Sequence, residues 1–328
     1  MARQHRIELI REIGRRRDSA VICYITGDRE NLSTRIAPDV VPVFYRQLEM
    51  LPDRRRIDLF LYTRGGDVIT PWRLVHLIRE YTPEFCVLVP FRSYSAGTLL
   101  CLGADEIVMG VMGELGPIDP SVINAYNPQD PYNPSARIPV NIEDVYSYLA
   151  LAGETASLDV DAMSRVFSIL AEKIHPLALG NVHRNYLLIR SLANKLLGLR
   201  KCRLCTENEG KIVDNLTEKL YAHNYTITRR EAAEDIGLPV SYPDKELERI
   251  IWALYDDFAR EFNLAEPFDP RDIISTGHRR EFDVPAGVVE SQYGCDYFIY
   301  SGVVEKRLHN GESQIDVDII KQGWRTVE

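Results

Sequence analysis

Short apolar runs alternate with stretches of helical spacing over the first 110 residues of the chain. The apolar runs predict strands at 20–27, 57–63, 86–90 and 106–110. Between the strands, apolar positions recur every three or four residues, which predicts helices at 40–51, 70–81 and 96–103. Alternation of this kind is typical of a parallel sheet with right-handed crossovers, so we expect an α/β fold.

The rest of the chain has a different texture. Residues 124–139 are rich in Asn, Pro and Asp and predict a surface excursion. Helical spacing predicts helices at 4–17, 159–174, 185–199, 211–223, 229–238 and 245–262. Runs of Tyr, Val and Ile over 289–324, with a hairpin signal at Asn310-Gly311, predict a small β-rich appendage.

These patterns divide the chain into four predicted segments. They are an N-terminal helix over 1–19, a main α/β domain over 20–240 with an insertion around 124–157, a helix and linker over 241–270, and the β-rich C-terminal appendage over 271–328. A chain of 328 residues with 45% hydrophobic content can bury one large core and a smaller one.

Composition narrows the functional classes. The net charge of −9 argues against nucleic acid as a partner. No apolar run approaches the roughly 20 residues of a membrane span, and the N-terminus lacks a signal-peptide centre, so we expect a cytoplasmic protein without an integral membrane segment. The six cysteines are scattered, which fits a reducing compartment. Only Cys202 and Cys205 have metal-ligand spacing, and a single pair favours ordinary thiols over a zinc site.

Two predicted strands end in residues that suit acyl transfer. The first leads into Arg64-Gly65-Gly66-Asp67, where glycines let backbone N–H groups approach a ligand closely. The second leads into Ser95-Ala96-Gly97-Thr98 at a helix start, whose positive end can stabilise an oxyanion. Ser95 is therefore predicted to be a nucleophile that faces an oxyanion hole. The alternative is that Ser95 only caps the helix.

Four short motifs carry a resemblance to a known family. Residues 62–67, 95–98, 104–109 and 115–120, in this order, are similar to the serine dehydrogenase proteinase family, which is related to signal peptide peptidase A and to Clp protease subunits. Further similarity at 173–180 and 223–232 extends the resemblance over roughly 20–240. It implies a Clp/crotonase-like parallel sheet with repeated ββα units. It also implies an oxyanion hole made by the N–H groups of Gly65 or Gly66 and of Ala96.

One position departs from the family pattern. The residue before the two glycines is usually proline in that family and is Arg64 here. An arginine at this position either points into the substrate cleft, together with Asp67, or projects outward without a role in catalysis. Both alternatives stay open from the sequence.

A serine nucleophile needs a base. Clp protease subunits carry a histidine about two dozen residues after the serine, but residues 114–119 contain none. Signal peptide peptidase relatives use a lysine, which can act as a base when burial lowers its pKa. The chain has no lysine before Lys173, so the resemblance implies a Ser95–Lys173 dyad. A solvated Lys173 at a helix end is the alternative, and His175, His183 and His223 are rival bases.

We therefore predict a serine peptidase that hydrolyses peptide bonds through an acyl-enzyme, independently of ATP and without a metal or organic cofactor. The resemblance implies a homo-oligomer that acts on peptide or protein substrates. Two alternatives stay open. One is a crotonase-like acyl-CoA enzyme, which would use the same oxyanion hole on thioesters, and the other is a non-catalytic oligomeric scaffold of the same fold.

Overall fold

The computed structural model of the chain describes residues 2–52, 55–118, 121–122, 124–133, 135–201, 206–217, 225–274, 277–309 and 312–327. They fall into two compact units. The sheet unit comprises Met1–Gly116, Leu196–Arg203 and Thr226–Glu328, and the helical unit comprises Pro117–Lys195 and Leu204–Tyr225. This division differs from the predicted segments. The part inserted into the α/β domain is larger than 124–157, and both predicted terminal segments belong to the sheet unit.

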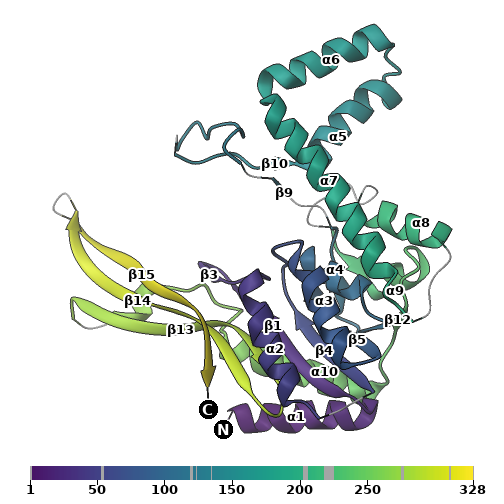
Figure 1. Cartoon of the computed structure of the whole chain (residues 1–328). Helices are drawn as coiled ribbons and strands as arrows, with labels where there is room; N and C mark the ends of the chain where they lie inside the picture. Colours follow the sequence, from purple (N-terminus) through teal and green to yellow (C-terminus); the bar gives the residue numbers. More distant parts are fainter. Residues whose placement is uncertain are drawn as a thin grey trace. The chain divides into compact units, whose positions relative to one another are not determined.

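An eight-stranded mixed sheet forms the centre of the sheet unit (Figure 1). Its order is β12 (Val240–Ser241), β7 (Glu106–Met109), β5 (Glu84–Val89), β4 (Arg56–Tyr62), β1 (Ala20–Thr26), β13 (Arg279–Glu290), β14 (Cys295–His309) and β15 (Glu312–Val327). The first five strands pair in parallel, as the alternating pattern predicted. All residues of β1 are buried, because helices cover both faces of a parallel sheet.

Helices form a layer on each face of this sheet. On one face, α1 (Ala2–Arg17) packs beside α10 (Lys245–Glu261), and both contribute to a core with side chains of β1, β4, β5 and β7. On the other face lie α2 (Val41–Met50), α3 (Thr70–Tyr81) and α4 (Ala96–Leu102). There the ring of Tyr24 in β1 meets Phe44 of α2 edge to face at 5.3 Å. The parallel strands therefore lie between two helical layers.

The predicted β-rich tail exists, but it is not a separate appendage. Strand β13 pairs antiparallel with β1, so that Tyr24 lies opposite Val289, and β14 and β15 continue the same sheet. The buried Arg6 of α1 also joins the tail, since its Nε lies 2.9 Å from Glu290 and its Nη2 donates to Tyr297 at 2.8 Å. The tail completes the core sheet. The repetition of ββα units stays a prediction.

Smaller elements complete the sheet unit. They are β2 (Asp28–Arg29) paired with β3 (Leu32–Ser33), a second sheet of β11 (Ile227–Thr228), β8 (Glu114–Leu115) and β6 (Arg92–Ser93), the short helices α9 (Arg229–Glu234) and α11 (Pro270–Ile273), and a 3₁₀ turn at Pro38–Val40. Strand β6 follows β5 directly and precedes α4. It therefore brings the start of the Ser95 motif alongside the end of β4.

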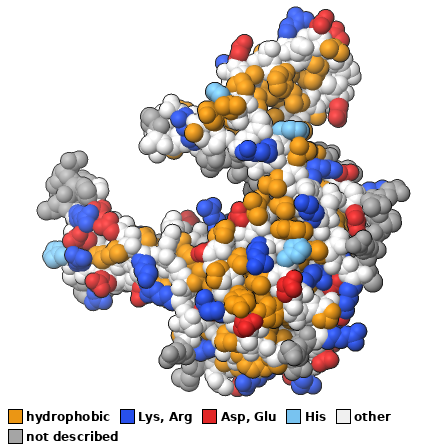
Figure 2. Space-filling model, viewed as in Figure 1, with side chains coloured by type: hydrophobic (Ala, Val, Ile, Leu, Met, Phe, Trp, Pro, Cys, Tyr) orange, Lys and Arg blue, Asp and Glu red, His pale blue; other side chains and the backbone are white. Residues whose placement is uncertain are grey.

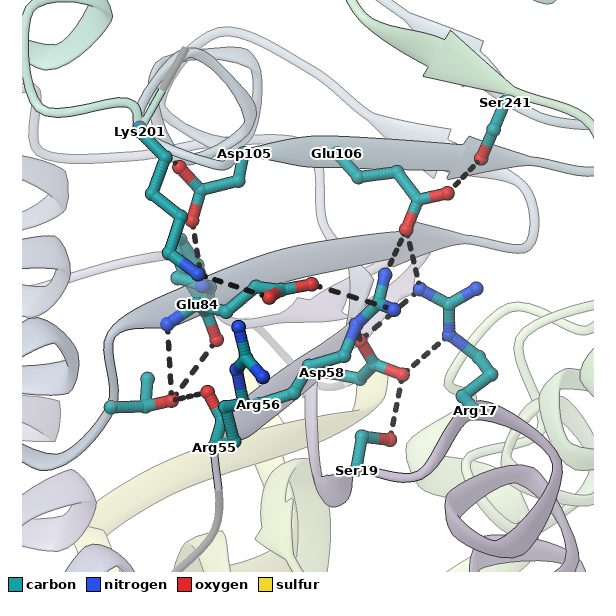
Figure 3. A network of polar contacts seen from close by, with 12 residues as sticks. Arg17, Ser19, Arg55, Arg56, Asp58, Glu84, Asp105, Glu106, Lys201 and Ser241 are labelled. Carbon is teal, nitrogen blue, oxygen red and sulfur yellow. Dashed lines mark hydrogen bonds and ion pairs between the residues drawn. The ribbon is translucent and has the colours of Figure 1, made fainter.

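Charged side chains tie together the amino ends of the parallel strands (Figure 3). Arg17, at the end of α1, bonds to Asp58 of β4 and lies 2.8 Å from the Glu106 carboxylate of β7. Ser241 of β12 donates to the second oxygen of Glu106 at 2.6 Å. Although burial alone raises the pKa of Glu106, these hydrogen bonds lower it below its usual value. The Glu106 carboxylate is therefore charged and connects three elements.

The same network holds the chain where it returns to the sheet unit. Lys201 Nζ lies 3.1 Å from the Glu84 carboxylate, and the Lys201 backbone N–H donates to Asp105 at 2.7 Å. Figure 3 shows both contacts beside the Arg17 cluster. The motifs with Gly65 and Ser95 follow the opposite, carboxyl ends of the strands. The charged contacts at the amino ends of the parallel strands therefore stabilise the fold, and the candidate site lies at the carboxyl ends.

The helical unit contains α5 (Ile142–Ala150) with a π turn at Leu151–Thr155, α6 (Val160–Lys173), α7 (Pro176–Leu197), α8 (Thr206–Thr217) and two short strands, β9 (Ser121–Val122) and β10 (Val140–Asn141). Helix α5 was not predicted. Helix α7 begins at Pro176 and not at 185, because proline suits the first helical position and His175 Nδ1 accepts the Leu177 N–H at 3.1 Å. Hydrophobic side chains gather on the face of α5–α7 seen in Figure 2. Among the described residues, no helix has the length and apolar character that a membrane span requires.

Candidate active site

Gly65 and Ser95 lie against each other where two strands end. The chain after β4 runs beside β6, since Thr63 N–H donates to the Arg92 carbonyl at 2.9 Å and Tyr94 N–H donates to the Thr63 carbonyl at 3.0 Å. A Cβ placed on Gly65 would lie only 2.8 Å from Ser95 Cβ. Only glycine therefore permits this approach, and the two motifs meet as the sequence predicted.

Ser95 occupies an unusual backbone conformation, with φ 51° and ψ −110°. It stands at the turn from β6 into α4, in the capping position, yet its hydroxyl makes no capping hydrogen bond. A non-glycine residue in such a sparsely populated region is held there by its surroundings, and such residues cluster at functional sites. A sharp strand-to-helix turn of this kind exposes a serine hydroxyl for attack. The geometry thus offers no support for the alternative that Ser95 is only a helix cap.

The two glycines differ in what their N–H groups do. Gly65 N–H donates to Thr63 Oγ1 at 2.9 Å, and the same oxygen accepts the Thr26 hydroxyl at 2.6 Å. Ile36 pairs with the neighbours of Gly66, because its N–H donates to the Gly65 carbonyl at 2.9 Å and its carbonyl accepts the Asp67 N–H at 2.8 Å. In this parallel pairing the N–H of Gly66 itself points away from Ile36.

Ala96 supplies a second N–H beside Ser95. Ala96 is the first residue of α4, so its N–H has no acceptor within the helix. The N–H groups of Gly66 and Ala96 are thus the candidate donors of an oxyanion hole, whereas the Gly65 N–H is already bonded to Thr63. Sequence reasoning missed Thr63 and Ile36, and neither carries a local signal that would have revealed its part in this loop.

Residues of the Ser95 motif and of the motif at 115–120 fix the serine turn. The Thr98 hydroxyl lies 2.9 Å from the Ser93 carbonyl and 2.8 Å from the Gly116 carbonyl, and it accepts the Gly116 N–H at 3.3 Å. A Cβ on Gly97 would lie 2.5 Å from Thr63 and 2.6 Å from Ser93. Gly97 and Thr98 therefore stabilise the turn through close packing and hydrogen bonds. Residues 119 and 120 of the last motif lie outside the described part of the chain.

The two charged residues that flank the glycines have different surroundings. One carboxylate oxygen of Asp67 accepts the N–H of Thr70 at 2.7 Å and its hydroxyl at 2.6 Å, so Asp67 fixes the start of α3. Arg64 has 61% of its side chain exposed and forms an ion pair with Asp28, with 2.8 Å between Arg64 Nε and the carboxylate. It lines a cleft that also contains Arg92.

The predicted bases belong to the helical unit, whereas Ser95 and the glycines belong to the sheet unit. Lys173 ends α6 and is exposed. His175 stacks on Tyr126 with 4.8 Å between ring centroids. His183 is exposed, and its Nδ1 lies 2.7 Å from the Tyr146 hydroxyl. His223 lies outside the described residues, as do Cys202 and Cys205.

The cysteines of the described segments are not alternative nucleophiles. Cys23, Cys86, Cys101 and Cys295 are all buried free thiols. Burial raises the pKa to about 12 for Cys86, Cys101 and Cys295, so these thiols stay protonated at neutral pH. Within the described residues, no group of three or more His, Cys, Asp or Glu side chains is arranged to hold a metal ion.

The chain is similar to a known protein family and to two curated proteins. The family model described as ClpP-like SDH-type serine proteinase matches residues 1–133. The uncharacterized protein MJ0137 of Methanocaldococcus jannaschii is 25% identical over 272 residues, which cover 80% of this chain and 82% of that protein. The uncharacterized protein MJ1495 of the same organism is 29% identical over 128 residues, which cover 36% of this chain and 42% of that protein. The segment matched by the family model contains Gly65, Gly66 and Ser95 and ends before Lys173.

Proposed function

Residues 1–133 belong to the ClpP-like SDH-type serine proteinase family, and from this premise we propose that the protein is a serine peptidase whose nucleophile is Ser95. The observation that carries the proposal is the turn at Ser95. Its backbone has a positive φ, its hydroxyl is left out of the helix cap, and Gly65 packs directly against its Cβ.

The proposed reaction has two steps. Ser95 Oγ loses its proton to a base and bonds to the peptide carbonyl carbon, and the carbonyl oxygen becomes an oxyanion that accepts hydrogen bonds from the N–H groups of Gly66 and Ala96. The C–N bond then breaks as the base returns the proton to the leaving amine. Water hydrolyses the resulting ester by the same route. Removal of one such donor typically costs about 3 to 4 kcal/mol of transition-state stabilisation.

Lys173 is our first choice for the base, and His175, His183 and His223 are the alternatives. Lys173 is exposed at the end of α6, so the proposal requires that it becomes buried beside Ser95 when the base acts. A ring nitrogen of His175 already accepts the Leu177 N–H, and a ring nitrogen of His183 is already bonded to Tyr146. These contacts support a structural role for each of the two histidines. A lysine base must be neutral when it accepts the proton, so a rate that depends on a lysine should rise with pH.

A fluorophosphonate probe tests the nucleophile, because it reacts covalently with an activated serine. We expect the purified protein to be labelled on the peptide that contains Ser95, and Ser95→Ala to abolish labelling. The matched control is Ser93→Ala, since Ser93 is buried two residues upstream with its Oγ 3.6 Å from Cys101 Sγ. Undiminished labelling of Ser95→Ala would overturn the assignment.

A second pair of variants tests the base. Lys173→Ala should lower the labelling rate and remove its rise with pH, whereas Lys195→Ala should not, because Lys195 is an exposed lysine near the end of α7. An unchanged rate in Lys173→Ala would move the search to His175, His183 and His223. A wild-type protein that never labels would favour a non-catalytic scaffold, and cleavage of thioesters without cleavage of peptides would favour an acyl-CoA enzyme.

We also propose that the protein is a homo-oligomer and that its helical unit contributes to the contacts. Phe167, Ile169 and Leu177 are each more than half exposed. Helices α5, α6 and α7 also enclose a groove of about 520 Å³ whose lining is mostly apolar, with Leu149 and Leu170 among its residues. Exposed apolar surface of this kind marks an interaction site.

A further inference from the structure

A cleft of about 640 Å³ opens in the sheet unit beside the glycine loop. Its lining includes Arg64, the residue directly before Gly65, so the cleft begins next to the residue that packs on Ser95. Three aromatic rings line it as well. Tyr255 lies 5.1 Å from Tyr62 and 5.7 Å from Phe91 between ring centroids.

A single carboxylate organises the charged wall of this cleft. Asp28 is 8% exposed, and one of its oxygens accepts the Tyr62 hydroxyl at 2.7 Å. Its other oxygen lies 2.8 Å from Arg64 Nε and 3.3 Å from Arg92 Nη1. Arg92 also lies over the ring of Phe91, with 4.3 Å from Cζ to the ring centroid. Asp28 therefore orients two guanidinium groups toward one cleft.

Arg64 keeps most of its hydrogen-bonding capacity. Its closest approach to Asp28 is through Nε, and 61% of the side chain is exposed. The planar fork of a guanidinium matches a carboxylate, and an anchored fork loses less side-chain entropy when it binds. The Asp28 contact thus prepares Arg64 to bind a carboxylate.

Acidic side chains restrict where such a carboxylate can bind. Glu30 and Glu266 also line the cleft, on adjoining segments, because Phe268 N–H donates to the Glu30 carbonyl at 2.8 Å and Arg29 Nε donates to the Glu266 carbonyl at 2.9 Å. Like charges repel a carboxylate from these segments. Of the other cations in the lining, Arg260 pairs with Asp256 at 3.2 Å and Arg92 is only 30% exposed. Arg64, which adjoins Gly65, is therefore the favourable position.

We propose that Arg64, oriented by Asp28, binds a carboxylate of the peptide substrate close to the scissile bond. This inference rests on the proposed function of Ser95. It assigns Arg64 as a specificity-determining residue and Asp28 as a positioning residue. The carboxylate belongs either to an acidic side chain of the substrate or to its C-terminus.

Peptide binding to the Ser95→Ala protein tests this assignment without the need for catalysis. The probes are fluorescent decapeptides of one neutral sequence that carry a single Glu, or a matching Gln, at each position in turn. A further pair ends in a free carboxylate or an amide. We expect about fivefold tighter binding of the carboxylate member of one pair at low salt, which corresponds to roughly 1 kcal/mol and decreases as salt screens the contact.

Adding Arg64→Leu to Ser95→Ala should abolish this preference, and adding Arg64→Lys, which keeps the charge but not the fork, should reduce it. The matched control adds Arg35→Leu, since Arg35 is an exposed arginine in the segment that pairs with Gly66. A preference for Glu at one position identifies a side chain as the source, and a preference for the free C-terminus identifies the terminus. Equal binding of all pairs, or a preference that survives Arg64→Leu, overturns the inference.

Probe labelling of the wild-type protein separates this inference from the proposed function. A protein that fails to label but discriminates Glu from Gln through Arg64 has the carboxylate site without the peptidase activity. A protein that labels at Ser95 but shows no discrimination has the activity without this site. The two failures therefore give different results.

Discussion

The backbone of Ser95 stores strain that glycine would release. With φ 51° and ψ −110°, Ser95 lies in a region that costs a residue with a Cβ roughly 1 to 3 kcal/mol. Glycine avoids most of this cost but loses about 0.4 to 1 kcal/mol more conformational entropy on folding. Ser95→Gly should therefore be about 1 kcal/mol more stable than Ser95→Ala.

Ser95→Ala is the correct reference because both variants lack the hydroxyl and differ only in the Cβ. Urea unfolding of the two proteins gives the difference directly, and thermal unfolding should show a midpoint about 2 °C higher for Ser95→Gly. The control pair is Ser93→Gly and Ser93→Ala. Ser93 is in β6 and has no positive φ, so there glycine should be the less stable variant. A Ser95→Gly protein that is no more stable than Ser95→Ala would refute the strain argument.

Three further predictions concern other parts of the molecule. Gly66→Ala would place a Cβ 2.1 Å from the Ile36 carbonyl oxygen, so it should destabilise the protein by about 2 to 4 kcal/mol and abolish probe labelling; an active, stable variant would contradict the loop geometry. Arg6→Leu leaves the buried Glu290 carboxylate without its main partner, so urea unfolding at pH 8 should show a loss of about 3 to 5 kcal/mol. Burial already raises the pKa of Glu290, and removal of Arg6 raises it further, so the carboxyl takes up a proton as pH falls. The loss of unfolding free energy should therefore be smaller at pH 5, and a loss that does not depend on pH would argue against this account. Phe167→Glu should lower the molar mass measured by light scattering during gel filtration, and an unchanged mass would exclude the exposed face of α6 from assembly.

Local patterns predicted the parallel part of the fold well. Strands at 20–27 and 57–63 and the helix at 70–81 correspond to β1, β4 and α3, because buried parallel strands appear in the sequence as continuous apolar runs. The motifs also predicted the family, which the match over residues 1–133 confirms. Short-range patterns are sufficient where neighbours in the chain are also neighbours in the sheet.

Long-range pairing could not be predicted in the same way. The runs over 289–324 predicted a β-rich appendage, but nothing in the sequence indicates that a strand at Arg279–Glu290 pairs with β1. Likewise, the difference between Gly65 and Gly66 depends on Thr63 and Ile36, whose hydrogen bonds follow from the fold and not from a motif. The base stays a prediction, because its candidates belong to the helical unit whereas Ser95 belongs to the sheet unit.

The burial of Arg6 sets an order for folding during synthesis. Its partners Asp257, Glu290 and Tyr297 follow it by 251, 284 and 291 residues, so the first helix cannot form its buried contacts until nearly the whole chain has left the ribosome. Strand β1 likewise has an unpaired edge until β13 is made. Such edges invite pairing with other chains, and contacts of this sequence separation slow folding. The nascent N-terminal half therefore exposes a strand edge and an incomplete core, which favour aggregation and chaperone binding until the C-terminal strands are made.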